Sequence, residues 1–155
     1  MQGTRPIATA VYLTGQLVLA VLLVLTLVRD GVDTTPLRSL AGWALCALGL
    51  GIAVASAFAL REAFTPFPAP RPGASLHTRG PFRRVRHPLY SGLIAAGGGI
   101  VLLDPSVLRL SMLAAFVVLL WRKAALEERL LAARFPGYAA YIAETGMFAP
   151  RVRRC

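Results

Sequence analysis

The stretch IATAVYLTGQLVLAVLLVLTLV (Ile7–Val28) decides the fold class, because it runs for 22 residues without a charged side chain. At about 1.5 Å of rise per residue, a helix of this length measures roughly 33 Å, which matches the hydrocarbon core of a bilayer. The apolar part of a signal peptide is shorter, about 7–15 residues, and a small-residue cleavage site follows it. Here Arg29-Asp30-Gly31 follows instead. The stretch therefore predicts a retained membrane span.

Three further apolar runs extend this pattern and predict an all-α integral membrane bundle of about four transmembrane helices. The second run covers Leu37–Leu60 and carries only Arg38 at its outer end. The third and fourth runs, Leu89–Leu103 and Ser106–Trp121, are short for a span and are separated by Asp104-Pro105. We expect these two runs to form a helical hairpin that either spans the membrane fully or re-enters it.

We expect a single membrane domain over residues 1–155. Residues 1–60 hold two spans, residues 61–88 form a cytoplasmic loop with six Arg and six Pro, and residues 89–155 hold the hairpin and a C-terminal helix. The charged helical pattern that starts at Arg122 predicts this last helix, which Pro136-Gly137 ends or kinks. Three consecutive glycines, Gly97-Gly98-Gly99, favour close helix packing in the third run over close approach of a ligand.

The charge of the chain is uneven. Of 155 residues, 56% are hydrophobic and only 15% are charged, yet the formal net charge is +10. The mean hydropathy of +0.62 excludes a disordered chain and disfavours a soluble nucleic-acid-binding protein, although the pI is near 11.2. With four spans, 14 of the 17 basic residues fall on one side, which the positive-inside rule makes the cytoplasm. We therefore expect a multi-pass protein of a bacterial inner membrane with both termini in the cytoplasm.

Two polar segments border the predicted hairpin on this basic side. The first is GPFRRVRHPLYSG (Gly80–Gly92), and the second is EERLLAARFPGYAAY (Glu127–Tyr141), which follows Arg122-Lys123. Singly, their residues have ordinary explanations, since arginines beside a span obey the positive-inside rule and a Lys–Glu pair four residues apart stabilises a helix. Because the segments lie at the two feet of one hairpin, we expect them to form a pocket at the membrane surface. The two cysteines predict no disulfide framework, and no metal-ligand spacing is present.

Together the two segments resemble the signature of the isoprenylcysteine carboxyl methyltransferase family, whose wider group includes membrane phospholipid N-methyltransferases. The resemblance covers about residues 74–150, and the pattern Arg-His-Pro-x-Tyr-x-Gly (86–92) is its specific core. The chain departs from the family at Pro136 and at Gly146-Met147. The resemblance implies a helical membrane enzyme that binds S-adenosylmethionine in a cytoplasmic pocket and takes a lipophilic small molecule or lipid from the bilayer. It implies no nucleic-acid partner, and the oligomeric state stays open.

The resemblance also implies roles for individual residues. The catalytic candidates are Glu127, which would hold a polar group of the cofactor, and Arg122 or Lys123, one of which would orient the substrate. Tyr138 and Tyr141 are expected to contact the substrate. The expected cofactor-binding residues lie in and just before the first segment and at the acidic pair of the second: Leu76, His77, Phe82, Arg86, His87, Pro88, Leu89, Tyr90, Gly92, Glu127 and Glu128.

The chemistry of methyl transfer is compatible with these residue types. A carboxylate acceptor is already ionised at pH 7 and needs alignment and exclusion of water, together with a cation such as Arg122 or Lys123. An amine acceptor needs a base, for which His87 and Glu128 are the candidates. We expect a carboxylate. Two alternatives remain: a nicotinamide-dependent membrane reductase of the sterol-reductase type, and a non-enzymatic four-helix membrane protein, which predicts no buried ionisable group.

Overall fold

The computed structural model describes residues 4–32, 35–60 and 76–151, and this part of the chain is helical without a named strand. The first part of the predicted loop, residues 61–75, lies outside the described residues. Within these ranges the elements are five α-helices and one short 3-10 helix: α1 (Thr4–Asp30), α2 (Pro36–Leu60), η2 (Gly80–Arg83), α3 (Pro88–Leu103), α4 (Val107–Arg134) and α5 (Tyr138–Glu144).

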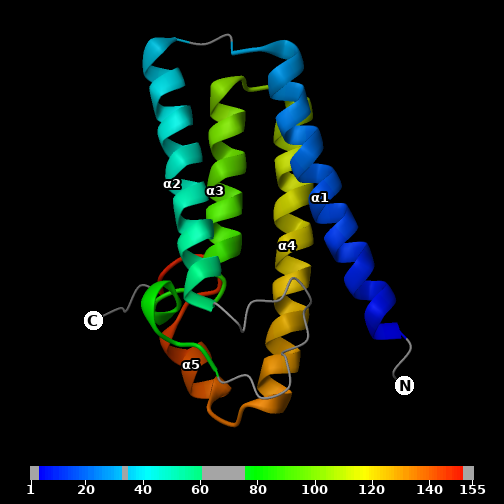
Figure 1. Cartoon of the computed structure of the whole chain (residues 1–155), viewed down its shortest axis with the longest axis vertical. Coiled ribbons are helices and arrows are strands. Elements are labelled where there is room, and N and C mark those ends of the chain that lie inside the picture. The colour runs from blue at the N-terminus through cyan, green and yellow to red at the C-terminus, as the bar shows by residue number, and fades with distance from the viewer. Residues whose placement is uncertain (1–3, 33–34, 61–75, 152–155) are drawn as a thin grey trace.

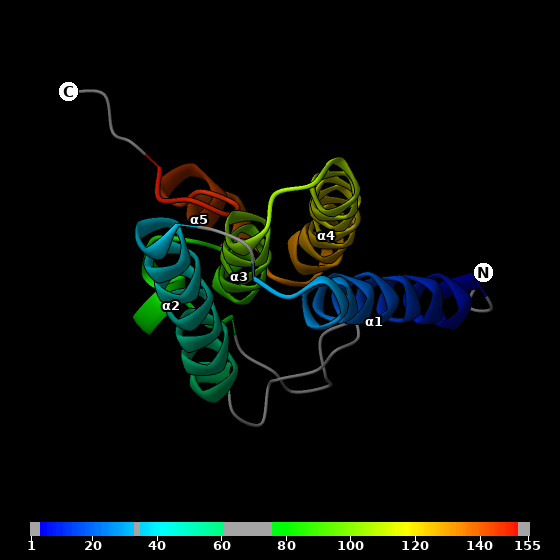
Figure 2. The same ribbon diagram turned by 90° about the horizontal axis from the view of Figure 1, so that it is seen from above.

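The four long helices run alternately up and down, as Figure 1 shows. The end of α1, the beginning of α2 and the α3–α4 turn lie together at one end, which we call the turn end. The beginning of α1, the beginning of α3, the end of α4 and the whole of α5 lie at the opposite end, which we call the α5 end. Seen from above, α3 lies between α2 and α4, and α1 lies along α4 (Figure 2), in agreement with the packing of α2 on α3 and of α1 on α4.

In the part of the chain that the structure describes, two helices are long and apolar enough, by length and composition, to cross a membrane: α1, over Ala10–Asp30, and α2, over Pro36–Leu60. The third apolar helix, α3, has 16 residues. The fourth, α4, has 28 residues but carries three basic side chains in its first half and middle: Arg109, Arg122 and Lys123. Large apolar side chains of α1 and α2, such as Leu17 and Leu48, are exposed, as expected for helices that face lipid.

Local sequence signals explain where the hairpin helices begin and end. Pro88 starts α3, where proline is favoured because the first helical residue needs no N–H donor. The turn at Asp104-Pro105 ends α3, and Ser106 caps α4 by accepting a hydrogen bond from the backbone N–H of Arg109 at 3.2 Å. We expected a separate C-terminal helix to start at Arg122. The structure differs, because the charged residues from Arg122 onward continue α4 without a break.

Glycines bring α2 and α3 into close contact. A Cβ atom on Gly49 would lie 2.5 Å from the backbone nitrogen of Ala96 and the carbonyl oxygen of Gly92, and one on Gly99 would lie 2.5 Å from Cys46 Sγ. The thiol of Cys46 also donates a hydrogen bond to the carbonyl oxygen of Ala96 at 3.4 Å. The prediction that the three-glycine run serves helix packing is confirmed.

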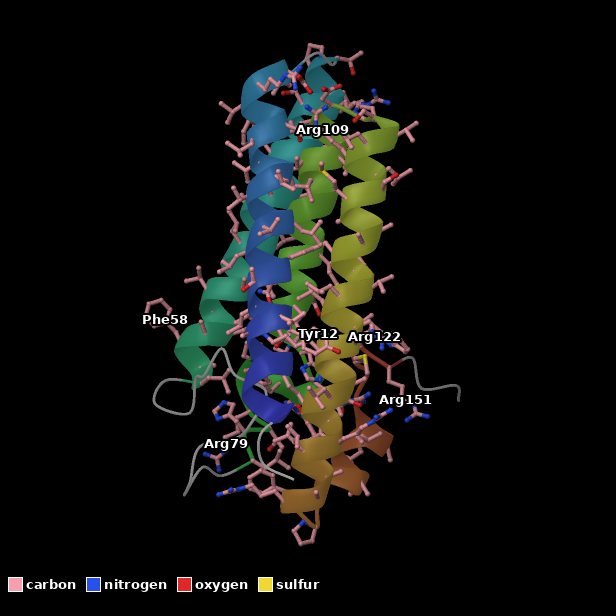
Figure 3. The ribbon with its side chains drawn as sticks, turned by 90° about the vertical axis from the view of Figure 1, so that its right-hand side faces the viewer. Tyr12, Phe58, Arg79, Arg109, Arg122 and Arg151 are labelled. Carbon is pink, nitrogen blue, oxygen red and sulfur yellow. The ribbon has the colours of Figure 1, made fainter. Side chains whose placement is uncertain are left out.

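A buried arginine ties the turn end together. The side chain of Arg109 is 1% exposed. Its guanidinium donates hydrogen bonds to Thr26 at the end of α1, at 3.2 Å to the hydroxyl and 2.7 Å to the carbonyl, and pairs with the carboxylates of Asp30 and Asp104. Figure 3 shows Arg109 at the end of the molecule opposite to Arg79 and Arg151. Burial of this charge is compatible with stability because the guanidinium is paired with two carboxylates and donates to further oxygen acceptors.

Candidate functional site

The segment after α5 folds back onto the beginning of α3 and braces the Arg-His-Pro-x-Tyr-x-Gly pattern. The backbone N–H of Arg86 donates to the carbonyl of Gly146 at 2.8 Å, and that of His87 donates to the carbonyl of Met147 at 3.0 Å. A third bond runs from the hydroxyl of Ser91 to the carbonyl of Phe148 at 2.6 Å. Because these bonds join segments about 60 residues apart in sequence, they hold the pattern in one conformation.

The guanidinium of Arg86 joins three elements at the α5 end. Its Nε donates to Glu128 Oε1 of α4 at 2.6 Å, and its Nη1 donates to the carbonyl oxygens of Thr145 and, at 3.3 Å, of Ile142. The side chains of Arg86 and Glu128 are 9% and 15% exposed, so this ion pair is largely shielded from water. Arg86 thus acts as a clamp between the start of α3, α4 and the segment that follows α5.

His87 lies between the two carboxylates of α4. Its Nδ1 is 3.5 Å from Glu127 Oε2, and its Nε2 is 3.3 Å from Glu128 Oε1, the latter outside hydrogen-bond geometry. The hydroxyl of Tyr90 donates to Glu127 Oε1 at 2.6 Å, and the rings of His87 and Tyr90 stack with centroids 5.4 Å apart. The ring of Phe148 covers His87 at 6.3 Å. The result is a buried acid–base network shared by α3 and α4.

The side chain of Lys123 extends this network toward α1. The residue is 2% exposed, its ammonium lies 5.2 Å from the centre of the Tyr90 ring, and it donates to Gln16 Oε1 at 3.2 Å. Arg122, the neighbouring candidate, is exposed and lies on another face of α4. One residue corresponds to about 100° of rotation on a helix, so only one of the two neighbours points into the bundle.

The two carboxylates have opposite electrostatic environments. Burial raises the pKa of Glu127, although His87, the Tyr90 hydroxyl and Lys123 each act to lower it. Burial also acts to raise the pKa of Glu128, but the contacts from His87 and Arg86 outweigh it, and the pKa of Glu128 is lowered. The pKa values of the two neighbouring carboxyl groups are therefore shifted in opposite directions, which is the arrangement that separates the roles of paired carboxylates in many acid–base sites.

The remaining predicted residues surround this network at different distances. His77 makes an edge contact with the ring of Phe82, whose carbonyl accepts a hydrogen bond from the hydroxyl of Tyr141 at 2.6 Å. Tyr138 is 1% exposed and packs against Tyr141. Burial raises the pKa of Tyr141 to about 12, which keeps its hydroxyl a donor. Leu76 and Leu89 are half-buried, Pro88 is buried, and Gly92 packs against α2 and not toward the network.

Two buried polar atoms of the site have no hydrogen-bond partner among the described residues. They are Nε2 of His87 and the hydroxyl oxygen of Tyr138. Unpaired polar atoms in a folded interior are costly, so each such atom requires an explanation. Their position beside the two carboxylates is consistent with a polar ligand that supplies the missing partners.

We did not predict three residues that take part in this network. Gln16 contacts Lys123, Thr145 accepts from Arg86, and Phe148 packs on His87. For Gln16 a signal existed, since it is the one amide side chain in the uncharged stretch Ile7–Val28. For Thr145 and Phe148 no local pattern points to the site, because their positions depend on how the segment after α5 folds back.

One comparison with known proteins gives a match. The family model described as phospholipid methyltransferase (PEMT) matches residues 37–137, which is more than half of the chain. The matched range contains α2, η2, α3 and α4, and therefore the network of Arg86, His87, Tyr90, Glu127 and Glu128, but leaves out α1 and α5. No curated protein and no solved structure matches the chain.

Proposed function

The chain belongs to the phospholipid methyltransferase family, and from this premise we propose that it transfers a methyl group from S-adenosylmethionine to a lipophilic acceptor at the membrane surface. The observation that supports this best is the buried network in which His87 and Tyr90 of α3 meet Glu127 and Glu128 of α4. The non-enzymatic alternative predicted no buried ionisable group, whereas His87 is 8% and Lys123 2% exposed.

The residues of the network fit the proposed cofactor. When bound, S-adenosylmethionine supplies a methyl group on a positively charged sulfur, and its amino-acid end carries an ammonium and a carboxylate. Glu127 and Glu128 would hold the ammonium, and the N–H groups of Arg86 and His87 would hold the carboxylate. Nε2 of His87 and the hydroxyl of Tyr138 would gain the partners that they lack. The proposed set also includes Leu76, His77 and Phe82 at its rim.

The topology that we propose places four helices across the membrane. In this arrangement α3 and the apolar part of α4 span together with α1 and α2, and the α5 end faces the cytoplasm of a bacterial cell. The distribution of basic residues supports this, because 14 of 17 fall on the α5 side of such a bundle. The hydrogen bonds at the turn end support a continuous hairpin, since Arg109 closes it against the end of α1.

For the acceptor we propose a carboxylate, as in the isoprenylcysteine carboxyl methyltransferases that the signature resembles. Lys123 supports this proposal, because its buried ammonium lies beside Tyr90 and would hold an anionic oxygen. A phospholipid amine is the second candidate. The raised pKa of Glu127 favours it, since methylation of an amine requires a base that accepts a proton.

Ligand binding tests the proposed function directly. Isothermal titration of the detergent-purified chain with S-adenosylhomocysteine should give saturable binding, and Glu127→Gln and His87→Ala should each weaken it by roughly tenfold or more. Arg129→Met is the matched control, because Arg129 is exposed on the same helix. Absence of binding by the wild type at millimolar ligand contradicts the proposal, and preferential binding of a nicotinamide dinucleotide favours the reductase alternative.

The product separates the two acceptor classes. Incubation with radiolabelled S-adenosylmethionine and a bacterial lipid extract should give a labelled lipid. A methyl ester releases volatile methanol in mild alkali, whereas a methylated amine keeps its label under the same treatment. Release of the label supports the carboxylate, and retention of the label refutes it in favour of the amine.

A further inference from the structure

Lys123 is the only lysine of the chain, and it is almost completely buried. Its residue exposure is 2%, although lysine is almost never fully buried unless its ammonium is paired. Among the described residues, its one hydrogen bond goes to Gln16 Oε1 at 3.2 Å, and the Tyr90 ring lies 5.2 Å away. The position of this cation therefore depends on a side chain from α1.

Most of the site is formed by α3, α4 and the segment after α5, and helix α1 contacts it from beside α4. It packs along α4, and Figure 3 shows Tyr12 of α1 and Arg122 of α4 at about the same level, toward the α5 end. Tyr12 lies one helical turn before Gln16, so the same part of α1 passes beside Lys123. The residues of α1 fall outside the family match at 37–137, which makes Gln16 a feature of this chain that the match does not cover.

Gln16 carries a neutral amide, and its effect on Lys123 therefore differs from that of an acidic residue. An amide in an apolar helix is costly unless its polar atoms are hydrogen-bonded, and here the carbonyl oxygen accepts from Lys123. Because the amide is neutral, it holds the ammonium without cancelling its charge. An ammonium has three N–H donors, and the bond to Gln16 uses one of them.

We propose that Gln16 is a positioning residue, which holds the ammonium of Lys123 against Tyr90 and keeps its charge available for an anionic oxygen of the acceptor. The first half of this statement concerns the chain alone, whereas the second half rests on the proposed function. If Gln16 holds the ammonium, loss of its oxygen leaves a buried cation with the Tyr90 ring and the Glu127 carboxylate as neighbours. The side chain then either moves toward water or loses its proton, and both changes make it more reactive toward acylating reagents.

Acylation of the only lysine measures this without any substrate. The detergent-purified full chain is treated with N-acetoxysuccinimide, and the modification of Lys123 is followed over time by peptide mass spectrometry. Gln16→Leu removes the carbonyl oxygen that accepts from Lys123, so labelling should rise roughly tenfold. Gln16→Asn shortens the side chain by one methylene and moves this oxygen away from Lys123, so labelling should rise by a smaller factor. Gln16→Glu keeps an oxygen in place and should stay within about twofold of the wild type.

Thr14→Val is the matched control, because Thr14 is exposed on the same part of α1. Unchanged labelling in Gln16→Leu overturns the proposal, and so does an equal rise in Gln16→Leu, Gln16→Glu and Thr14→Val, which would indicate general loosening of α1. If Gln16→Leu does not fold, the contrast between Gln16→Asn and Gln16→Glu makes the same decision.

Kinetics test the second half separately. With the lipid acceptor varied, Gln16→Leu should raise KM for the acceptor, while the binding of S-adenosylhomocysteine stays at its wild-type affinity. Gln16→Glu should also raise KM for the acceptor, because it holds the ammonium but neutralises it. Altered labelling without a change in KM overturns only the acceptor role, and failure of the wild type to bind S-adenosylhomocysteine refutes the proposed function while the labelling result stands.

Discussion

Replacing Arg86 by methionine removes the clamp between α3, α4 and the segment after α5. Methionine has a similar length and is apolar, so the space stays filled while the charge and the donors are lost. Glu128 loses the cation at 2.6 Å, and the carbonyl oxygens of Ile142 and Thr145 lose their donor. The backbone bonds from Arg86 and His87 to Gly146 and Met147 remain, so the segment still has a docking surface.

The size of the effect follows from how buried the pair is. Removal of one partner from a buried ion pair costs about 3–5 kcal/mol, and the side-chain exposures of 9% and 15% place this pair in that class. Because the backbone hydrogen bonds from Arg86 and His87 to Gly146 and Met147 remain, we take the lower end of this range. A cost of about 3 kcal/mol corresponds to roughly a hundredfold increase in the population of the undocked segment.

Amide hydrogen exchange followed by mass spectrometry measures this population. The backbone N–H of Gly146 donates to the carbonyl of Arg84 at 3.2 Å and becomes free only when the segment undocks. In Arg86→Met, exchange in the peptide that contains Gly146 should accelerate by about a hundredfold, while peptides from the α2–α3 contact should exchange as in the wild type. In Arg86→Lys, exchange in the same peptide should be faster than in the wild type and slower than in Arg86→Met, because an ammonium keeps the charge but cannot reproduce the planar fork of a guanidinium.

Arg83→Met serves as the control, since Arg83 is exposed three residues earlier. Exchange at Gly146 that changes by less than about threefold in Arg86→Met refutes the clamp. Equal acceleration in peptides of α2 and α3 would also refute it, because the loss would then be global and not confined to the docked segment.

Three further predictions concern the network and the helix contact. Tyr90→Phe removes the hydroxyl that donates to Glu127 at 2.6 Å, so the pKa of Glu127 should rise further. When the affinity for S-adenosylhomocysteine is plotted against pH, its decline on the acid side should then move upward by about one pH unit. An unmoved acid-side decline contradicts the role of Glu127 in binding. The pKa of Glu128 is lowered, so its contribution to stability is complete above its ordinary value of 4.5 and is lost as the pH falls through its folded-state pKa. The pKa of Glu127 is raised, so its contribution to stability is complete below 4.5 and is lost as the pH rises through its folded-state pKa. Melting temperatures measured against pH should therefore lose part of their acid-side decline in Glu128→Gln and part of their alkaline-side decline in Glu127→Gln, and the reverse pattern would overturn the two assignments. Gly49→Ala should lower stability by about 1–3 kcal/mol because its Cβ meets the α3 backbone, while Gly51→Ala on the same helix meets nothing within 4 Å and should be neutral or stabilising; equal thermal melts of the two variants contradict the close packing.

The helices of this chain were predictable because their signals are local. Uncharged length marks α1 and α2, Pro88 marks the start of α3, and Asp104-Pro105 marks the turn. The continuation of α4 past Arg122 was missed for an equally local reason. A change from apolar to charged residues looks like a boundary, but Arg, Lys, Ala, Leu and Glu are all strong helix formers and do not end a helix.

The site was predictable only in part, because its members come from distant segments. The two motif segments brought His87 and Glu127 into one hypothesis, but they left Arg122 and Lys123 as alternatives for the residue that orients the substrate. The burial of Arg109 depends on Asp30 and Asp104 meeting at the turn end, which requires knowledge of how α1 packs. The same holds for Gln16, whose partner lies 107 residues away.

The glycine contact between α2 and α3 restricts how this protein can change by mutation. Where a Cβ on Gly49 or Gly92 would meet the opposite backbone, any larger residue pushes the two helices apart, so this half of the bundle cannot be remodelled one substitution at a time. Helix α1 has no such restriction, since many of its side chains are exposed and its contact with Lys123 is made by a single amide. A library that aims to change the range of the proposed lipophilic acceptors should therefore vary α1 and leave the α2–α3 half constant.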